Sequence, residues 1–537
     1  MTLKHRFTAL AGSAIVIALA GACNPDLDVI NPNAPDVARA IATPSDVRQL
    51  IGSSYNTWYL GMQGGAVAPF EPNPGNATEV MADVATMAFG NHGARFNGQE
   101  PRLAYANSSA AGDGRVASQP YDNMYGALGA ANDGLKAIAR GVRVAASASA
   151  PDETEQFQAF AWMVQGLALG FQALVFNEGF VVLEDTPDAS AVLEPYGAVN
   201  TAAVASLDKA IAAATGKSWS IPAEFTPGIN LTAANLVKMA STMAARQLAY
   251  VPRTASENAA VNWASVLSYA DKGISTGTPF DLQIQGDGGN IWFDLFKGYM
   301  HLESWVRIDQ RIIHQADPTQ PVVFTSTVAP PRAVPADLRF ARGTPDAAGN
   351  VKQPGADFWY YQAIPFDAAR GVYFFGNWAH ARYADHSFEV DAPFLTLAPY
   401  VLAAENDLLI AEALVRTNGD KARAASLINR TRVGRGGLSP VTAATPDNEL
   451  IGAIFYERDV ELWGTAAGRG WFDRRRIDAT ATHNGVNIGN IWAFRGGSNL
   501  QKGTPRSLPV PAKELETLNI PVYTFGGDAP NPVFPET

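Results

Sequence analysis

Hydrophobic residues recur at helical spacing along much of the chain. The apolar positions of residues 120–139 follow the period of a helix with one buried face. They are Tyr121, Tyr125, Leu128, Ala131, Leu135 and Ile138. Residues 155–177 are apolar on nearly every side, which is typical of a helix packed between others. Residues 200–214 and 232–250 show two more helical patterns, so the chain is predicted to be mainly α.

A helical hairpin is predicted in the C-terminal part of the chain. One long helix is expected over residues 394–416, and Asn418-Gly419 supplies a left-handed stop. Asp420 is placed to cap the next helix, over residues 421–432. Two antiparallel helices on so short a link form one unit of a helical-repeat array. The spacing resembles tetratricopeptide units without repeating cleanly. We therefore expect an imperfect tetratricopeptide-like helical scaffold.

A further helix is predicted to begin near Thr445 and to end near Trp463. Thr445 is a suitable cap, Pro446 suits the first helical position, and acidic residues follow at the positive end of the helix dipole.

Three long segments interrupt the helical pattern: residues 60–118, 275–392 and 480–537. They are rich in Gly, Pro and Asn and contain many aromatic residues. Loops of this length in a compact protein are usually functional or disordered, and the aromatic content favours order. We expect these segments to form a loop-rich, ligand-binding half.

The N-terminus has the parts of a secretory signal peptide. Lys4 and Arg6 precede an apolar stretch from Phe7 to Ala20. This stretch is shorter than the roughly 20 residues that span a bilayer, and small residues follow it.

A lipid attachment site is predicted directly after that stretch. Ala20-Gly21-Ala22 leads into Cys23, which is the single cysteine of the chain, and the arrangement resembles a bacterial lipobox. We therefore expect a signal peptide over residues 1–22, a lipidated N-terminus and tether over 23–40, and one domain over 41–537. Membrane contact would then be made by acyl chains.

Composition excludes several classes of protein. The net charge of −11 gives no support to nucleic-acid binding, which favours a basic face. One cysteine rules out a disulfide framework and a cysteine-rich metal site.

A series of motifs marks the C-terminal third. They are Asn429 with Arg432, then Glu457-Arg458-Asp459-Val460-Glu461-Leu462, then the run from Arg469 to Arg476, and then Leu508-Pro509-Val510-Pro511. In this order and spacing they resemble the RagB/SusD family of outer-membrane nutrient-binding lipoproteins. Residues 464–468 depart from the Glu-Gly pair usual in that family, and Arg474 replaces a leucine. For this reason no ligand contact is transferred from the family.

No catalytic residue and no cofactor are predicted, and the resemblance implies a nutrient-binding protein. It implies attachment to the outer membrane through Cys23, facing the exterior. It also implies that the protein caps a TonB-dependent transporter of the SusC type and delivers glycans or peptides to it. Two readings from other classes stay open: a cell-surface glycan hydrolase that uses loop carboxylates, and a structural or adhesive surface protein.

The charged motifs are interpreted as scaffold, in preference to an anion-binding site. Arg458 and Glu461 are three residues apart on one helical face. The arginines of residues 469–476 are expected to bond helix C-terminal carbonyls and Glu457 or Glu461 in forked geometry.

Motifs for catalysis and metal binding give little support to an enzyme. The sequence has no G-x-S-x-G elbow. Gly216-Lys217-Ser218 resembles the end of a phosphate-binding loop, but Ile211 occupies the place of its first glycine. His380 and His386 are six residues apart, which fits no usual helical ligand spacing, so no metal site is predicted. Paired carboxylates stay open because they need only spatial proximity.

Aromatic residues in the loops are the best sequence clue to ligand contact. A sugar ring has one apolar face and a polar rim, so a flat aromatic side chain beside an amide or carboxylate suits it. The predicted ligand-binding residues are Trp292, Trp305, Trp359, Tyr360, Trp378 and Asn290. Trp292 follows a glycine-rich stretch and is expected at a loop tip. For each of these aromatic residues, core packing is the competing interpretation.

Overall fold

The computed structural model describes residues 43–64, 74–90, 93–110, 115–187, 191–277, 280–477, 480–488 and 500–528. Residues Thr43–Thr537 form one compact unit. The predicted signal peptide, Cys23 and the tether lie outside the described residues. Among the described helices, one is long and apolar enough to cross a membrane, Thr154–Val175, and its apolar stretch is 89% buried against the rest of the protein.

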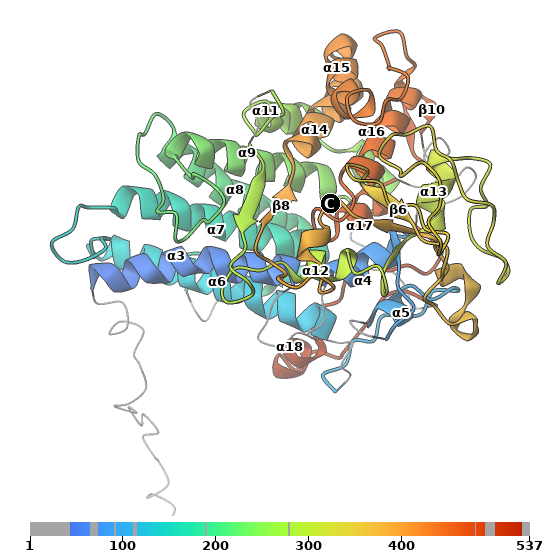
Figure 1. Ribbon diagram of the computed structural model, residues 1–537. Coiled ribbons are helices and arrows are strands. Elements are labelled where there is room, and N and C mark those ends of the chain that lie inside the picture. The colour runs from blue at the N-terminus through green and yellow to red at the C-terminus, as the bar shows by residue number, and fades with distance from the viewer. Residues whose placement is uncertain are drawn as a thin grey trace, which may run out of the picture. The chain divides into compact units, whose positions relative to one another are not determined.

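Long helices packed side by side form one part of the molecule (Figure 1). They are α3 (Pro44–Gln63), α6 (Arg115–Ala139), α7 (Thr154–Val175), α8 (Tyr196–Ala214) and α9 (Ala233–Tyr250). Helix α7 packs against α6 and α8, and α3 packs against α6. Thr43 begins α3 with a reciprocal cap, in which its hydroxyl accepts from the Asp46 amide. The four helices predicted from periodicity in this region are confirmed.

A second group of helices continues this packing from α9. It contains α10 (Ala255–Ala259), α11 (Trp263–Ala270), α14 (Ala403–Arg416), α15 (Lys421–Arg432), α16 (Asp447–Glu461) and α17 (Arg469–Arg475). Helix α14 packs against α11, α15 and α16. Asn418 has a φ of 53°, and the Asp420 carboxylate accepts from the Arg423 amide at 3.0 Å. The predicted stop and cap between α14 and α15 are therefore confirmed.

The expected helix over 394–416 is wrong in its first part. Residues Leu397–Val401 form strand β8, which pairs antiparallel with β4 (Leu282–Gln285). Pro399 lies within β8, where its missing N–H would break a helix. Helix α14 begins only at Ala403, whose amide donates to the Asp281 carboxylate at 2.7 Å.

The predicted cap of α16 is also wrong. Pro446 occupies the N-cap position, and the first helical residue is Asp447. The Thr445 hydroxyl instead accepts from the Thr442 amide at 2.9 Å, so it closes the preceding turn.

Short elements and long loops complete the molecule. The helices are α4 (Pro74–Met81), α5 (Ala94–Asn97), α12 (Leu295–Met300), α13 (Gln310–Ala316) and α18 (Ala512–Thr517). The paired strands are β1 (Ala85–Thr86) with β5 (Arg307–Ile308), β2 (Glu178–Phe180) with β3 (Leu193–Pro195), β6 (Phe358–Tyr360) with β7 (Trp378–His380), and β9 (Thr482–His483) with β10 (Val486–Asn487). Single turns of 3₁₀-helix cover Ala368–Arg370, Val372–Phe374 and Ala384–His386.

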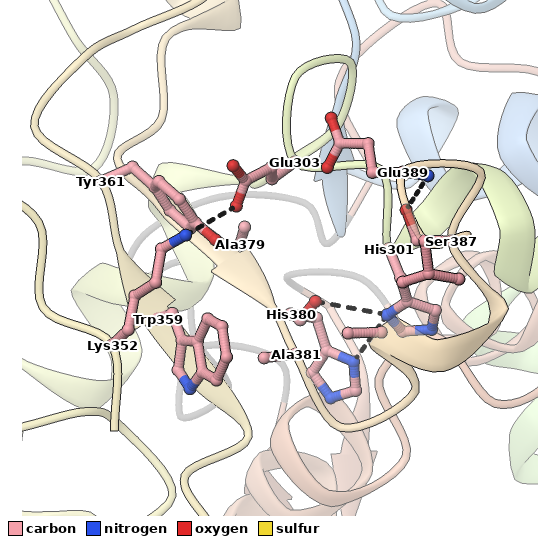
Figure 2. A pocket seen from close by; sticks show the side chains of 12 residues that line it. His301, Glu303, Lys352, Trp359, Tyr361, Ala379, His380, Ala381, Ser387 and Glu389 are labelled. Atoms are coloured by element: carbon pink, nitrogen blue, oxygen red, sulfur yellow. Dashed lines mark hydrogen bonds and ion pairs between the residues drawn. The ribbon is translucent and has the colours of Figure 1, made fainter. Parts of the chain in front are cut away.

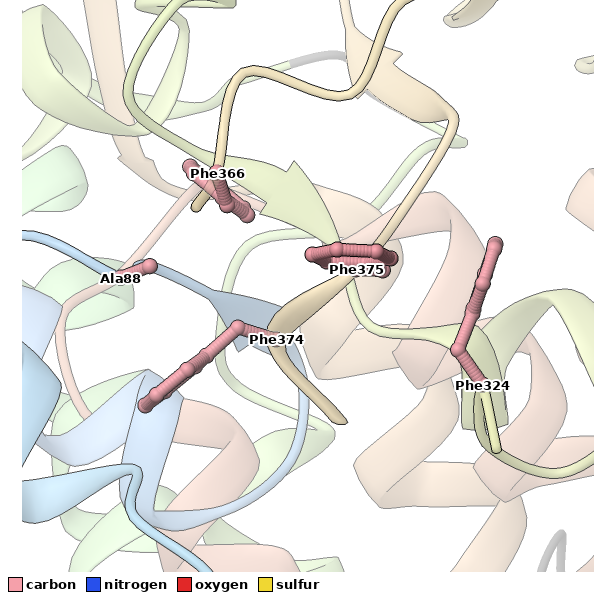
Figure 3. Packing of buried hydrophobic residues seen from close by; sticks show 5 residues of the cluster. All are labelled: Ala88, Phe324, Phe366, Phe374 and Phe375. Atoms are coloured by element: carbon pink, nitrogen blue, oxygen red, sulfur yellow. The ribbon is translucent and has the colours of Figure 1, made fainter. Parts of the chain in front are cut away.

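Aromatic packing orders these loops. Phe324, Phe366, Phe374 and Phe375 are buried together with Ala88, although they come from three separate stretches of the chain (Figure 3). A buried aromatic side chain removes a large apolar area from water, which offsets the entropy lost on ordering a loop. Within the described residues, this packing joins loop segments that lie far apart in the sequence.

The charged motifs of the C-terminal third form a buried ion-pair network. The Arg458 guanidinium donates to Glu412 at 2.6 Å and to Asp473 at 3.1 Å, and all three side chains are fully buried. Arg476 makes two parallel bonds to Glu412, both at 2.9 Å. Burial alone would raise the pKa of the Glu412 carboxyl, but the charges of Arg476 and Arg458 hold it far below its ordinary value.

The interpretation as scaffold fits this burial. Arg475 donates to a helix C-terminal carbonyl as expected, that of Tyr250 at the end of α9, at 3.0 Å. The expected carboxylate partners, by contrast, are wrong. Arg474 forks onto Asp459, with distances of 2.8 and 3.0 Å. Glu457 and Glu461 both bond Arg339 instead, at 2.7 and 3.2 Å. Arg339 lies in a loop more than a hundred residues earlier in the chain, so no local helical spacing could indicate it.

Candidate functional site

A cavity of about 170 Å³ opens beside the β6–β7 hairpin (Figure 2). Its walls come from the hairpin, from the segment before β6, and from the segments after α12 and after β7. The lining residues are His301, Glu303, Lys352, Trp359, Tyr361, Ala379, His380, Ala381, Ala384, Ser387, Glu389 and Val390.

The register of the hairpin explains why the cavity is open. Side chains alternate between the two faces of a strand, so Trp359 points away from the face that buries Phe358 and Tyr360. Trp359 is paired across the hairpin with Ala379, whose methyl group leaves the space in front of the indole unfilled. The Trp359 indole N–H donates to the Gln353 carbonyl at 3.0 Å, which fixes the ring while one part of it stays exposed.

A lysine lies against the aromatic wall of the cavity. The Lys352 ammonium is 4.8 Å from the ring centre of Tyr361 and 5.7 Å from that of Trp359. It is also 3.9 Å from a carboxylate oxygen of Glu303, as the dashed line in Figure 2 shows. A cation near two ring faces and a carboxylate is attracted by all three. The wall therefore combines flat apolar surface with a charged donor.

Two carboxylates, Glu303 and Glu389, lie on the same side of the cavity (Figure 2). Partial burial raises the pKa of Glu303, Lys352 opposes this, and the negative charge of Glu389 adds to it. Carboxylate oxygens accept hydrogen bonds from hydroxyl and amine groups. These side chains give the cavity acceptors opposite its aromatic wall.

A buried pair of histidines closes the back of the cavity. The Nδ1 atoms of His301 and His380 are 3.1 Å apart, so one of them must carry the proton and the other must accept it. Burial lowers the pKa of His301 to about 3 and lowers that of His380 well below its ordinary value. Both rings are therefore neutral at physiological pH. His386 faces a different direction, since its Nε2 lies 3.1 Å from the Leu397 carbonyl.

Trp292 is not at a loop tip, so that expectation is wrong. It is 7% exposed, and its ring centre lies 6.0 Å from that of Tyr55 and 6.2 Å from that of Tyr59. The glycine-rich turn closes on itself, because the Asp287 amide donates to the Trp292 carbonyl at 3.0 Å. The turn thereby directs the indole back onto helix α3.

Tyr360 and Trp378 are also buried, and their rings pack together 5.5 Å apart on the closed face of the hairpin. Trp305 is half-buried and stacks on Phe89 at 5.0 Å. Asn290 is exposed, and its side-chain amide donates to the Asp287 carbonyl within the same turn. Of the six predicted residues, only Trp359 lines this cavity.

Sequence reasoning missed several lining residues, and one of them left a signal. Trp359 and Tyr361 are two apart, so strand alternation places them on one face and Tyr360 on the other. Glu303, Lys352 and Glu389 come from distant loops, and no spacing in the sequence indicates that they meet.

A second depression, of about 280 Å³, lies beside the end of α9 and is lined mainly by apolar groups. Its one carboxylate, Glu257, already accepts from the Tyr196 hydroxyl at 2.7 Å and from the Arg253 amide at 2.8 Å. The cavity beside Trp359 therefore offers the richer set of groups for a polar ligand.

The scaffold of helices with a loop-built cavity defines a SusD-like fold. Residues 403–517 match the sequence profile of the SusD family. A SusD superfamily protein from Parabacteroides distasonis superposes with a TM-score of 0.59 and 13% identity, covering 88% of this chain and 98% of that chain. A SusD homolog from Bacteroides thetaiotaomicron gives 0.57 and 14%, covering 88% and 96%.

Surface glycan-binding protein A from Bacteroides uniformis has the same fold, with a TM-score of 0.53, 14% identity and coverage of 88% and 98%. At these identities the solved structures show the fold, and the match over residues 403–517 adds the family's sequence pattern. No curated protein matches the chain. Residues 403–517 thus carry the sequence pattern of the SusD family, and the chain shares the fold of SusD superfamily structures.

Proposed function

We propose that this protein is a cell-surface glycan-binding lipoprotein of the outer membrane and that the cavity beside Trp359 holds the sugar. The observation that carries the proposal is the fixed, partly exposed indole of Trp359 facing an open volume that also contains Lys352, Glu303 and Glu389. Aromatic faces suit the apolar side of a sugar ring, and the charged groups suit its hydroxyls. One similar structure is that of a surface glycan-binding protein.

The partner in this proposal is a SusC-type TonB-dependent transporter that receives the bound glycan. Lipid attached to Cys23 would hold the protein at the membrane, facing the exterior. Cys23→Ser should then abolish palmitate labelling and release the protein from the membrane fraction, since stable anchoring takes more than one acyl chain. Labelling that persists in the variant would contradict the assignment.

The glycan-binding role is tested with two tryptophans of the same hairpin. Wild type, Trp359→Ala and Trp378→Ala are titrated calorimetrically against a panel of neutral and acidic oligosaccharides and peptides. Trp359→Ala should weaken glycan binding about five- to thirtyfold, since an aromatic contact contributes roughly 1–2 kcal/mol. Trp378→Ala should instead lower stability by about 3–5 kcal/mol, as a buried tryptophan does.

Trp378→Ala should retain the affinity of wild type in whatever fraction stays folded. Binding that is insensitive to Trp359→Ala would place the ligand elsewhere. The same incubations are assayed for new reducing ends, because Glu303 and Glu389 face one cavity and a hydrolase is the rival function. Glycan binding without new reducing ends supports the binding protein, and selective capture of peptides would favour the peptide-binding alternative.

A further inference from the structure

We propose that the cavity beside Trp359 selects neutral saccharides and disfavours saccharides that carry carboxylate or sulfate groups. This inference rests on the proposed glycan-binding function and specifies its ligand. It follows from which charged groups face the cavity and from the contacts that each of them makes.

The charges that line the cavity are unequal in sign. Glu303 comes from the segment after α12, Glu389 from the segment after β7, and Lys352 from the segment before β6. The histidine pair at the back is neutral, because both rings are buried and burial lowers the pKa of each. The described lining residues therefore present two carboxylates and one ammonium.

The single ammonium lies beside a carboxylate of the same cavity. Lys352 is 4.8 Å from the Tyr361 ring centre and 3.9 Å from Glu303, so a ligand anion that approaches Lys352 also approaches the negative charge of Glu303. A second cation, Arg307, packs behind Tyr361 at 4.7 Å and donates to the backbone carbonyls of Glu303 and Ala363. These hydrogen bonds hold the loop, and Arg307 is not among the residues that line the cavity.

Glu389 is the group that an incoming anion would meet. Its side chain is exposed and takes part in no ion pair within the described residues. A ligand carboxylate beside it would add a like charge in a partly enclosed site, where repulsion is stronger than in open water. A hydroxyl, by contrast, can donate to Glu303 or Glu389 and accept from Lys352. The arrangement fits a polyhydroxyl edge without negative charge.

The experiment compares matched probes on the full chain. Cellotetraose, maltotetraose, galactotetraose and xylotetraose are titrated first, beside tetragalacturonate and tetraglucuronate. Where a tetrahexose binds, its derivative oxidised from hydroxymethyl to carboxylate at C6 is titrated next. The oxidised form should bind about tenfold more weakly than its parent. Raising sodium chloride from 0.05 M to 1 M should reduce this difference in affinity, because salt screens the repulsion between the ligand and the carboxylates.

A charge-neutralising variant provides the second readout. In the Glu303→Gln/Glu389→Gln double variant, the parent ligand should bind at most about threefold more tightly than its oxidised form. This ratio of affinities is the readout, even if the variant changes the affinity for the parent ligand. Glu155→Gln, on α7 and outside the lining, is the matched control and should leave the ratio as in wild type.

The outcomes separate the two proposals. Equal or tighter binding of the oxidised form in wild type overturns charge selection while leaving glycan binding in place. A ratio of affinities that changes neither with salt nor in the double variant also overturns charge selection. Failure of every saccharide to bind, or binding that Trp359→Ala does not weaken, overturns the proposed function itself.

Discussion

Charged side chains are concentrated in two regions of this molecule, with opposite consequences. Between α14, α16 and α17, buried guanidinium and carboxylate groups bond one another, as Arg458 does with Glu412 at 2.6 Å and with Asp473 at 3.1 Å. Beside the β6–β7 hairpin, Glu303 and Lys352 stand 3.9 Å apart, and Glu389 faces open space. The first region has satisfied its charges within the fold, whereas the second keeps polar groups available. The most conspicuous charged motif in the sequence is therefore structural, and the candidate site lies among less conspicuous residues.

The largest effect should come from breaking the buried network. Arg458→Ala leaves Glu412 and Asp473 buried with one partner fewer, and we expect a loss of about 3–5 kcal/mol in the free energy of unfolding. Arg423→Ala is the matched control, because its pair with Asp271 is about 40% exposed on both sides, and it should cost at most about 1 kcal/mol. Urea denaturation of both variants makes the comparison. Equal stability of the two variants would contradict the structural role of the network.

Trp292→Ala is the next test, because it separates core aromatic residues from cavity aromatic residues. Trp292 is buried against Tyr55 and Tyr59, so the change should destabilise the protein by about 3–5 kcal/mol. Trp305→Ala removes a half-buried ring and should cost less. The measurement is the denaturation midpoint, followed by ligand affinity on the same preparation. Loss of ligand affinity in Trp292→Ala without loss of stability would show that Trp292 contacts the ligand and does not serve mainly in core packing.

The buried carboxyl of Glu79 should make the free energy of unfolding depend on pH. Burial raises the pKa of Glu79 to about 7, although Arg469 opposes the shift. A carboxyl whose pKa is raised on folding stabilises the protein below its unfolded pKa, and this contribution is lost as the pH rises through about 7.

Glu79→Gln should therefore gain stability relative to wild type between pH 5 and pH 8. The expected gain approaches about 3 kcal/mol, at about 1.4 kcal/mol for each pH unit between the unfolded and folded pKa. Glutamine can still accept from the Gly470 amide, which Glu79 bonds at 3.2 Å. The free energy of unfolding of both proteins is measured at three pH values. If the difference between variant and wild type does not change with pH, Glu79 is ionised throughout this range.

The smallest effect should come from the cavity lysine. Lys352→Met keeps an apolar chain against Trp359 and Tyr361 and removes a partly exposed charge, so stability should change by about 1 kcal/mol or less. Thermal unfolding in low and high salt measures the change. A loss of stability as large as that of Arg458→Ala would show that the cavity lysine is as important to the fold as the buried ion-pair network.

Sequence alone determined the helical part of this protein to a large extent. The apolar period of residues 120–139 and 155–177, the left-handed Asn418 and the Asp420 cap are local signals, because hydrogen bonds and side chains within a few residues satisfy them. The motif order near residues 429–511 resembles that of the SusD family, whose profile matches residues 403–517. Local pattern failed at residues 394–402, where pairing with β4, a hundred residues away in the chain, produced a strand.

Only the tertiary structure decided the partners of the buried charges and the residues of the cavity. Arg339 reaches Glu457 across 118 positions, and Glu303, Lys352 and Glu389 meet from three separate loops. Whether an aromatic ring packs or faces a ligand depends on what lies opposite it, as Trp359 opposite Ala379 differs from Trp292 beneath Tyr55. Composition indicated aromatic loops, but long-range packing determined which ring faces the cavity, because burial depends on neighbours distant in the sequence.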